Sequence, residues 1–269
     1  MISMSLLGLV VGILMGLTGA GGGVLAVPGL MLVMDWEVVQ AAPLAMFSVM
    51  LSAGIGALGA LRQGLVRYRA AILMAAAAMP FSSLGVQLAQ GLAPVLLNSL
   101  FAVILLYIAA RQMRACIRGD VADEDNEAAL CRVDSQTGRL TWSWTTGCVI
   151  AGIGVVTGFL TGLLGVGGAF FMVPMLRRLT DISLQGVIAT VLLVMALVSA
   201  GSLMFVGLHG VSIPLTMAVP FVAAAVLGML LGRILVRRLS ARVLQCSFGG
   251  LVLVVGLLVA FRTVQGLLG

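Results

Sequence analysis

Long uncharged runs are the feature of this sequence that most restricts its fold. Val95–Ala110 and Val243–Ala260 contain no charged side chain, and Met4–Met34 extends this character over 31 residues. A helix that crosses a bilayer needs about 20 mostly apolar residues, whereas a strand of a membrane barrel alternates polar and apolar residues. The sequence therefore predicts an all-α polytopic membrane protein.

Composition and charge agree with a membrane protein. Only 9% of the residues are charged, against about 25% in soluble domains. The net charge of +6 comes from arginines that lie between apolar runs, without a basic face or interleaved aromatic residues, so nucleic acid is not an expected partner. We expect most arginines to be anchors at the membrane surface and the apolar N-terminus to be a retained membrane segment.

The cysteines show no CxxC pair and no Cys/His cluster. They are therefore expected to be scattered, unpaired thiols. They stand at Cys116, Cys131, Cys148 and Cys246.

A glycine-rich segment interrupts the first run and returns in the second half of the chain. Gly16–Pro28 reads GLTGAGGGVLAVP, and Gly162–Pro174 reads GLLGVGGAFFMVP. Each glycine inside a helix costs about 1 kcal/mol, so we expect the helix to stop here and a short helix to start near Val24, with Pro28 in its first turns. Such a break is compatible with a re-entrant loop and with two short crossing helices.

The two halves of the chain are related by duplication. At a shift of 146 or 147 residues, ordered glycine, proline and aspartate positions coincide, as do the glycines that recur every fourth residue before each break. That spacing puts the glycines on one helix face, where we expect a neighbouring helix to approach closely. We therefore divide the chain into a first membrane repeat (1–115), a polar linker (116–141) and a second membrane repeat (142–269). Besides the broken segments, the expected spans are Ala41–Leu61, Ala70–Leu88, Val95–Ala110, Ser183–Val206, Ile213–Gly232 and Val243–Phe261.

The arginines predict how the halves are oriented, because arginine in loops favours the cytoplasm. If each broken segment crosses once, the halves are parallel and the 15 arginines divide nine to six. If each broken segment returns to its starting side, the halves are inverted and 14 arginines share one side, leaving only Arg262 on the other. The second arrangement is favoured, with both termini outside and the linker in the cytoplasm.

The two breaks are predicted to meet near the bilayer midplane and to bind a small anion. A helix N-terminus carries free N–H groups and about half a positive charge, and glycine lets an oxyanion approach them closely; tight helix packing alone is the alternative role. The candidate substrate-binding residues are Thr18, Gly19, Gly21, Gly22 and Gly23 at the first break and Gly165, Gly167, Gly168 and Ala169 at the second. Hydroxyls in the following spans could support them: Ser48, Ser52, Thr190 and Ser199.

Enzyme activity is not expected. Gly19–Gly23 superficially suggests a dinucleotide loop, but no strand precedes it. An intramembrane serine protease would need a serine activated by a neighbouring base, and the single histidine lies in a loop. We assign no catalytic residues, no metal and no cofactor. A non-transporting membrane scaffold or assembly protein is the alternative to a transporter.

The repeated motif resembles that of the TauE/SafE sulfite exporter family. The likeness rests on Gly16–Pro28 and Gly162–Pro174, in a small twofold-repeated membrane protein with a polar central linker. It implies a bacterial inner-membrane permease for sulfite, sulfonates or related sulfur-containing or organic acid anions. Export is implied, with uptake as the open alternative. The implied partners are the anion, membrane lipids and protons as coupling ion; a homodimer is left open.

Overall fold

The computed structural model describes residues 2–18, 22–118, 143–165, 168–180, 182–208, 215–235 and 241–268. The polar linker expected at 116–141 lies almost entirely outside these ranges. Within them the chain forms ten α-helices: α1 Ile2–Thr18, α2 Gly22–Met34, α3 Val38–Arg62, α4 Tyr68–Gly91, α5 Pro94–Arg118, α6 Trp144–Leu164, α7 Ala169–Leu179, α8 Leu184–Leu208, α9 Leu215–Leu235 and α10 Ala241–Leu268.

Six of the described helices, α3, α4, α5, α6, α8 and α9, are long and apolar enough to cross a membrane. Helices suit this environment because lipid offers no hydrogen-bond partners to the backbone. The prediction of an all-α polytopic membrane protein is confirmed, and each expected span corresponds to a helix. By contrast α2 has 13 residues and α7 has 11, about 20 and 17 Å at 1.5 Å per residue, which is short of the ~30 Å hydrocarbon core.

Both glycine-rich segments interrupt a helix, as expected. Gly29 of α2 packs against Leu7 of α1, so α2 folds back along α1 as a helical hairpin. α2 begins at Gly22, two residues before the predicted start, and contains Pro28. In the second half, α6 and α7 are the two helices that flank the break, and α7 contains Pro174.

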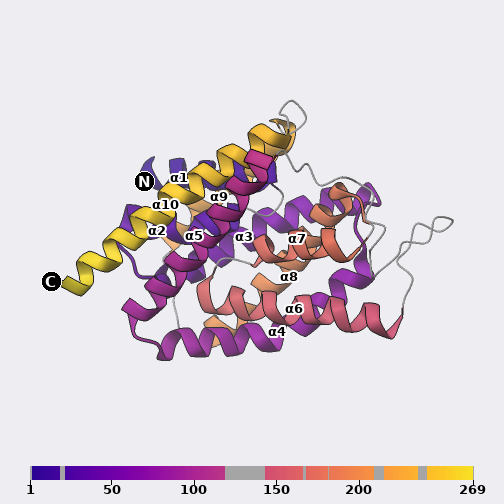
Figure 1. Cartoon of the computed structure of the whole chain (residues 1–269), viewed down its shortest axis with the longest axis horizontal. Helices are drawn as coiled ribbons and strands as arrows, with labels where there is room; N and C mark the ends of the chain where they lie inside the picture. The colour runs from indigo at the N-terminus through magenta and orange to yellow at the C-terminus, as the bar shows by residue number, and fades with distance from the viewer. Residues whose placement is uncertain are drawn as a thin grey trace.

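The helices pair across the two halves of the sequence. α1 packs against α9, and α4 packs against α6, which lie side by side along the lower edge of Figure 1. The two halves are thus interleaved, and the buried residues form two main clusters that each draw on both halves. The N and C ends of the chain both lie on the left of this view.

Glycines set the close approach between α1 and α9. A Cβ at Gly8, Gly12 or Gly16 would run into the backbone carbonyl of a residue on α9, and those residues are Phe221, Ala225 and Met229 in the same order. The two helices therefore run parallel. The prediction that glycines at every fourth position allow a close helix contact is confirmed.

The same contact recurs between α6 and α4. A Cβ at Gly154, Gly158 or Gly162 would meet the carbonyl oxygens of Met74, Ala78 and Ser82. These three α4 residues and their α9 counterparts differ by 147 positions. Equivalent glycines therefore face equivalent backbone positions in the opposite half.

The central pair, α3 and α8, runs antiparallel. Gly56 of α3 lies against Leu192 of α8. Leu65, just beyond the end of α3, lies against Gly186, near the start of α8. Residue numbers therefore increase along α3 while those of its contacts on α8 decrease, so the two helices run in opposite directions.

The pair formed by α5 and α10 is also antiparallel. Gly256 of α10 packs on Leu105 of α5, and Gly249 packs on Met113. Cys246, on the same helix α10, is disulfide-bonded, so the expectation of four unpaired thiols is wrong. A disulfide joins residues that tertiary packing brings together, which sequence spacing does not reveal. Cys148 is a free, exposed thiol, and Cys131 lies outside the described residues.

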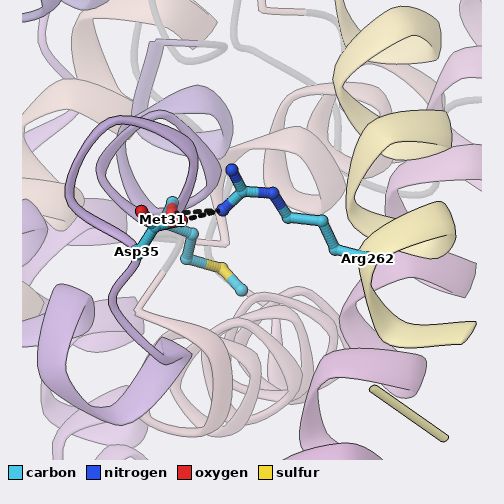
Figure 2. A network of polar contacts seen from close by, with 3 residues as sticks. All are labelled: Met31, Asp35 and Arg262. Carbon is cyan, nitrogen blue, oxygen red and sulfur yellow. Dashed lines mark hydrogen bonds and ion pairs between the residues drawn. The ribbon is translucent and has the colours of Figure 1, made fainter. Parts of the chain in front are cut away.

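An arginine of α10 holds the end of α2. Arg262 Nη1 donates to Met31 O at 3.2 Å and to Asp35 Oδ1 at 2.6 Å, as Figure 2 shows. Free carbonyls at a helix C-terminus carry partial negative charge, so a cation is favourable there. Asp35 has a φ of 54°, the left-handed conformation common after a helix end.

Arg233 is also more than a surface anchor. It stands in the last turn of α9, and its Nη1 donates to Gly56 O of α3 at 3.1 Å. The side chain therefore ties α9 to the central helix pair.

Candidate functional site

The second break is built by two glycines in left-handed conformation. Gly165 ends α6 with φ 69°, and its N–H donates to Thr161 O at 2.9 Å. Gly168 precedes α7 with φ 55°. Residues with a Cβ rarely adopt these angles, so the sequence needs glycine at both positions to turn the chain between the two helices.

Gly165 also packs against the first half of the molecule. A Cβ at this position would lie 2.8 Å from Ala42 Cα on α3 and 3.2 Å from Val27 Cγ2 on α2. The second break therefore contacts α2, the helix that follows the first break. Gly165 therefore takes part in close packing, which was expected for these glycines either alone or together with anion binding.

The N-terminus of α7 is buried and has no side-chain cap. Gly168 supplies no side chain to cap the helix, and Ala169 is fully buried. The N–H groups of Phe171 and Met172 bond to Gly168 O. The amides of Ala169 and Phe170 have no intrahelical acceptor, as in the first turn of any helix.

Two threonines of α6, absent from our sequence prediction, flank this N-terminus. A Cβ at Gly168 would lie 2.8 Å from Thr157 O and 3.0 Å from Thr161 Oγ1. Both threonines are 1% exposed. Thr161 donates its hydroxyl to Thr157 O at 2.7 Å, whereas Thr157 Oγ1 has no hydrogen-bond partner in the described part of the chain.

A sequence signal for these threonines existed. They precede Gly165 by eight and four residues. That spacing puts both threonines on one face of α6, in the turns before the break. The predicted hydroxyls were Thr18 before the first break and residues in the spans after the breaks, so these two threonines were missed.

The first break is less polar in its described part. Gly22 lies in α2, Gly23 is buried, and Gly19 and Gly21, like Gly167 of the second break, lie outside the described residues. Thr18 Oγ1 donates to Leu14 O at 2.7 Å, so its proton is already engaged. Whether the two breaks form one site stays a prediction.

Positions equivalent to the two threonines are apolar in the first half. Thr157 and Thr161 correspond, at the shift of 146, to Val11 and Met15, which are 3% and 1% exposed. The second break thus has buried hydroxyls that the first lacks.

The four supporting hydroxyls are all buried, but they differ in their partners. Thr190 donates to Gly186 O at 2.7 Å and accepts from the Arg67 N–H at 3.1 Å, which ties the α3–α4 loop to α8. The oxygens of Ser52 and Ser199 have no partner among the described residues. Ser48 is 2% exposed. Thr190 therefore has a structural role, and the two unpartnered serines stay candidates.

The fold and this site define a class: a multi-pass helical membrane protein whose short helices α2 and α7 start inside the bundle. Residues 4–259 match the family model described as sulfite exporter TauE/SafE, and the chain belongs to that family. The resemblance noted in the sequence is thereby confirmed over nearly the whole chain. Members of the family are transporters. No curated protein and no solved structure matches the chain significantly.

Proposed function

We propose that the chain is a secondary transporter that moves a small anion, such as sulfite, a sulfonate or a related sulfur-containing or organic acid anion, across the bacterial inner membrane. One observation carries the proposal: α7 begins inside the protein with an uncapped first turn, beside two buried threonines of α6, of which Thr157 has an unpartnered hydroxyl. Helix N-termini favour anions through their free amides and dipole. The family match supports sulfite as the first anion to test.

The polarity of the surroundings supports an anion over a cation. The carboxylates of the described residues are Asp35 and Glu37, and both are exposed beyond the end of α2. A cation inside the bundle would have no carboxylate near it from this part of the chain. Amide N–H groups and hydroxyl protons are suited to oxyanions.

We infer further that residues 1–115 and 142–269 are inverted repeats joined by the 116–141 linker. α3, shifted by 146 residues, coincides with α8, and the two run antiparallel. Parallel repeats would direct equivalent helices the same way. Together with the arginine distribution, this supports periplasmic termini and a cytoplasmic linker.

Alternating access follows from this plan. Inverted repeats with broken helices form the substrate site of many transporters, and one repeat rocks against the other around it. The helical hairpins α1–α2 and α6–α7 are the broken elements here. Export agrees with the family description; protons as coupling ion and assembly into a homodimer remain part of the proposal.

Flux of labelled sulfite into proteoliposomes tests the function. Wild-type protein should accumulate label above empty liposomes. Gly168→Ala should lose transport, since a Cβ there meets Thr157 O in a conformation that costs about 1–2 kcal/mol for residues other than glycine.

Gly152→Ala is the matched control, because a Cβ at Gly152 on the neighbouring helix α6 meets nothing within 4 Å. It should transport as wild type does. If well-folded wild-type protein moves none of sulfite, thiosulfate and methanesulfonate, the transporter proposal fails and the scaffold alternative replaces it.

A further inference from the structure

Two buried serines at the centre of the molecule lack hydrogen-bond partners. Ser52 on α3 is 1% exposed and Ser199 on α8 is fully buried, and neither hydroxyl oxygen is bonded within the described ranges. A helical serine or threonine commonly donates to the carbonyl four residues earlier. Ser202 and Thr190 do so on α8. The two unpartnered serines therefore lack the bond that these hydroxyls form.

The two serines lie at the same level of the α3–α8 contact. A Cβ at Gly54 of α3 would lie 4.0 Å from Ala196 Cβ of α8. Ser52 is two residues before Gly54, and Ser199 is three residues after Ala196. Because the helices are antiparallel, both serines are displaced in the same direction, by about 3 and about 4.5 Å at 1.5 Å per residue.

The repeat places these two positions one residue apart. At the shift of 146 residues that carries α3 onto α8, Ser52 corresponds to Val198, the residue before Ser199. A hydroxyl from each half therefore stands where the two equivalent central helices meet.

The surrounding cluster connects this position with the second break. Ala53 and Val198, next to the two serines in sequence, belong to the same buried cluster as Ala169, the first residue of α7. Met15, near the end of α1, belongs to it as well. The helix ends beside both breaks thus pack into the cluster that holds the serines.

We propose that Ser52 and Ser199 together form a central binding station for the transported oxyanion, donating one hydrogen bond each. This inference rests on the proposed transport function and names the residues that hold the substrate midway. A hydroxyl has one proton to donate, so two hydroxyls at this level suit an anion with at least two oxygens, such as sulfite. Because each half of the chain supplies one hydroxyl donor, the station remains favourable for the anion when either helical hairpin moves.

Sulfite binding to purified variants tests the station. Loss of a hydrogen bond to an anion weakens binding by about 10- to 100-fold, and we expect this for Ser52→Ala and for Ser199→Ala. Ser202→Ala is the matched control on α8, since its hydroxyl is bonded to Val198 O and to Ser82. It should bind sulfite within about twofold of wild type, because its bonds are already satisfied inside the protein.

Thermal unfolding without sulfite shows whether a variant binds less sulfite because a hydrogen bond to the anion is lost or because the protein is less stable. Removing an unpartnered buried hydroxyl should not lower the unfolding temperature of Ser52→Ala or Ser199→Ala, whereas Ser202→Ala loses satisfied bonds and should unfold earlier. If wild type transports sulfite and both station variants bind it as tightly as wild type, the station is refuted and the transport function stands. If wild type neither binds nor transports sulfite, thiosulfate or methanesulfonate, the function fails and the station fails with it.

Discussion

Replacing Thr157 by valine should stabilise the protein and weaken its anion binding at the same time. Valine preserves the shape of threonine but removes a hydroxyl that is 1% exposed and has no described partner. An unsatisfied buried polar group costs about 1–3 kcal/mol. Thr157→Val should therefore unfold at a higher temperature than wild type when no anion is present.

Added sulfite should reduce this difference in stability, because it stabilises wild type more than the variant. A hydrogen bond to a charged group contributes about 1.5–3 kcal/mol, so its loss raises the dissociation constant at least about tenfold. At a sulfite concentration 100 times the wild-type dissociation constant, wild type gains about 2.7 kcal/mol of stability, and a tenfold weaker variant gains about 1.4 kcal/mol. Thermal unfolding in detergent with and without sulfite measures both quantities.

Thr180→Val, just after the C-terminal end of α7, is the control for this prediction. Its buried hydroxyl is bonded to Leu176 O, so its removal should lower stability by about 1 kcal/mol and leave the sulfite effect intact. The reasoning is refuted if Thr157→Val is less stable than wild type and keeps the full sulfite-induced stabilisation, since the hydroxyl would then be satisfied inside the protein.

Three further predictions concern the scaffold and its topology. Arg262→Ala should lower stability by no more than about 1 kcal/mol, because its ion pair with Asp35 is largely exposed; a loss of several kcal/mol in thermal unfolding would contradict this. Gly12→Val should prevent recovery of monodisperse protein on size exclusion, because its side chain would enter the α9 backbone, whereas Gly152→Val should elute as wild type; equal recovery of both would refute the packing argument. A membrane-impermeant maleimide added to intact spheroplasts should leave Cys131 of the linker unlabelled, and its labelling from outside would overturn the inverted topology.

The anion site was predictable only in part. The glycines at 165 and 168 identified the second break, because positive backbone angles leave few other residues able to turn the chain there. Thr157 was missed since its importance comes from the approach of α7 to α6. Whether a serine is engaged with its own helix, as Ser202 is, or left without a partner, as Ser199 is, depends on side-chain conformation, which no pattern of residue types contains.

The sequence by itself determined the apolar helices, their interruptions and the glycine faces, because these depend on local hydrophobicity and on the backbone cost of glycine within a few residues. Tertiary structure alone decided which helix meets which glycine face, with α1 joined to α9 and α6 to α4. It also decided that Arg262 holds the end of α2 and that Cys246 is bonded. The physical reason is distance along the chain. These contacts join segments that only the packing of the whole bundle brings together, and no interaction between residues close in sequence specifies them.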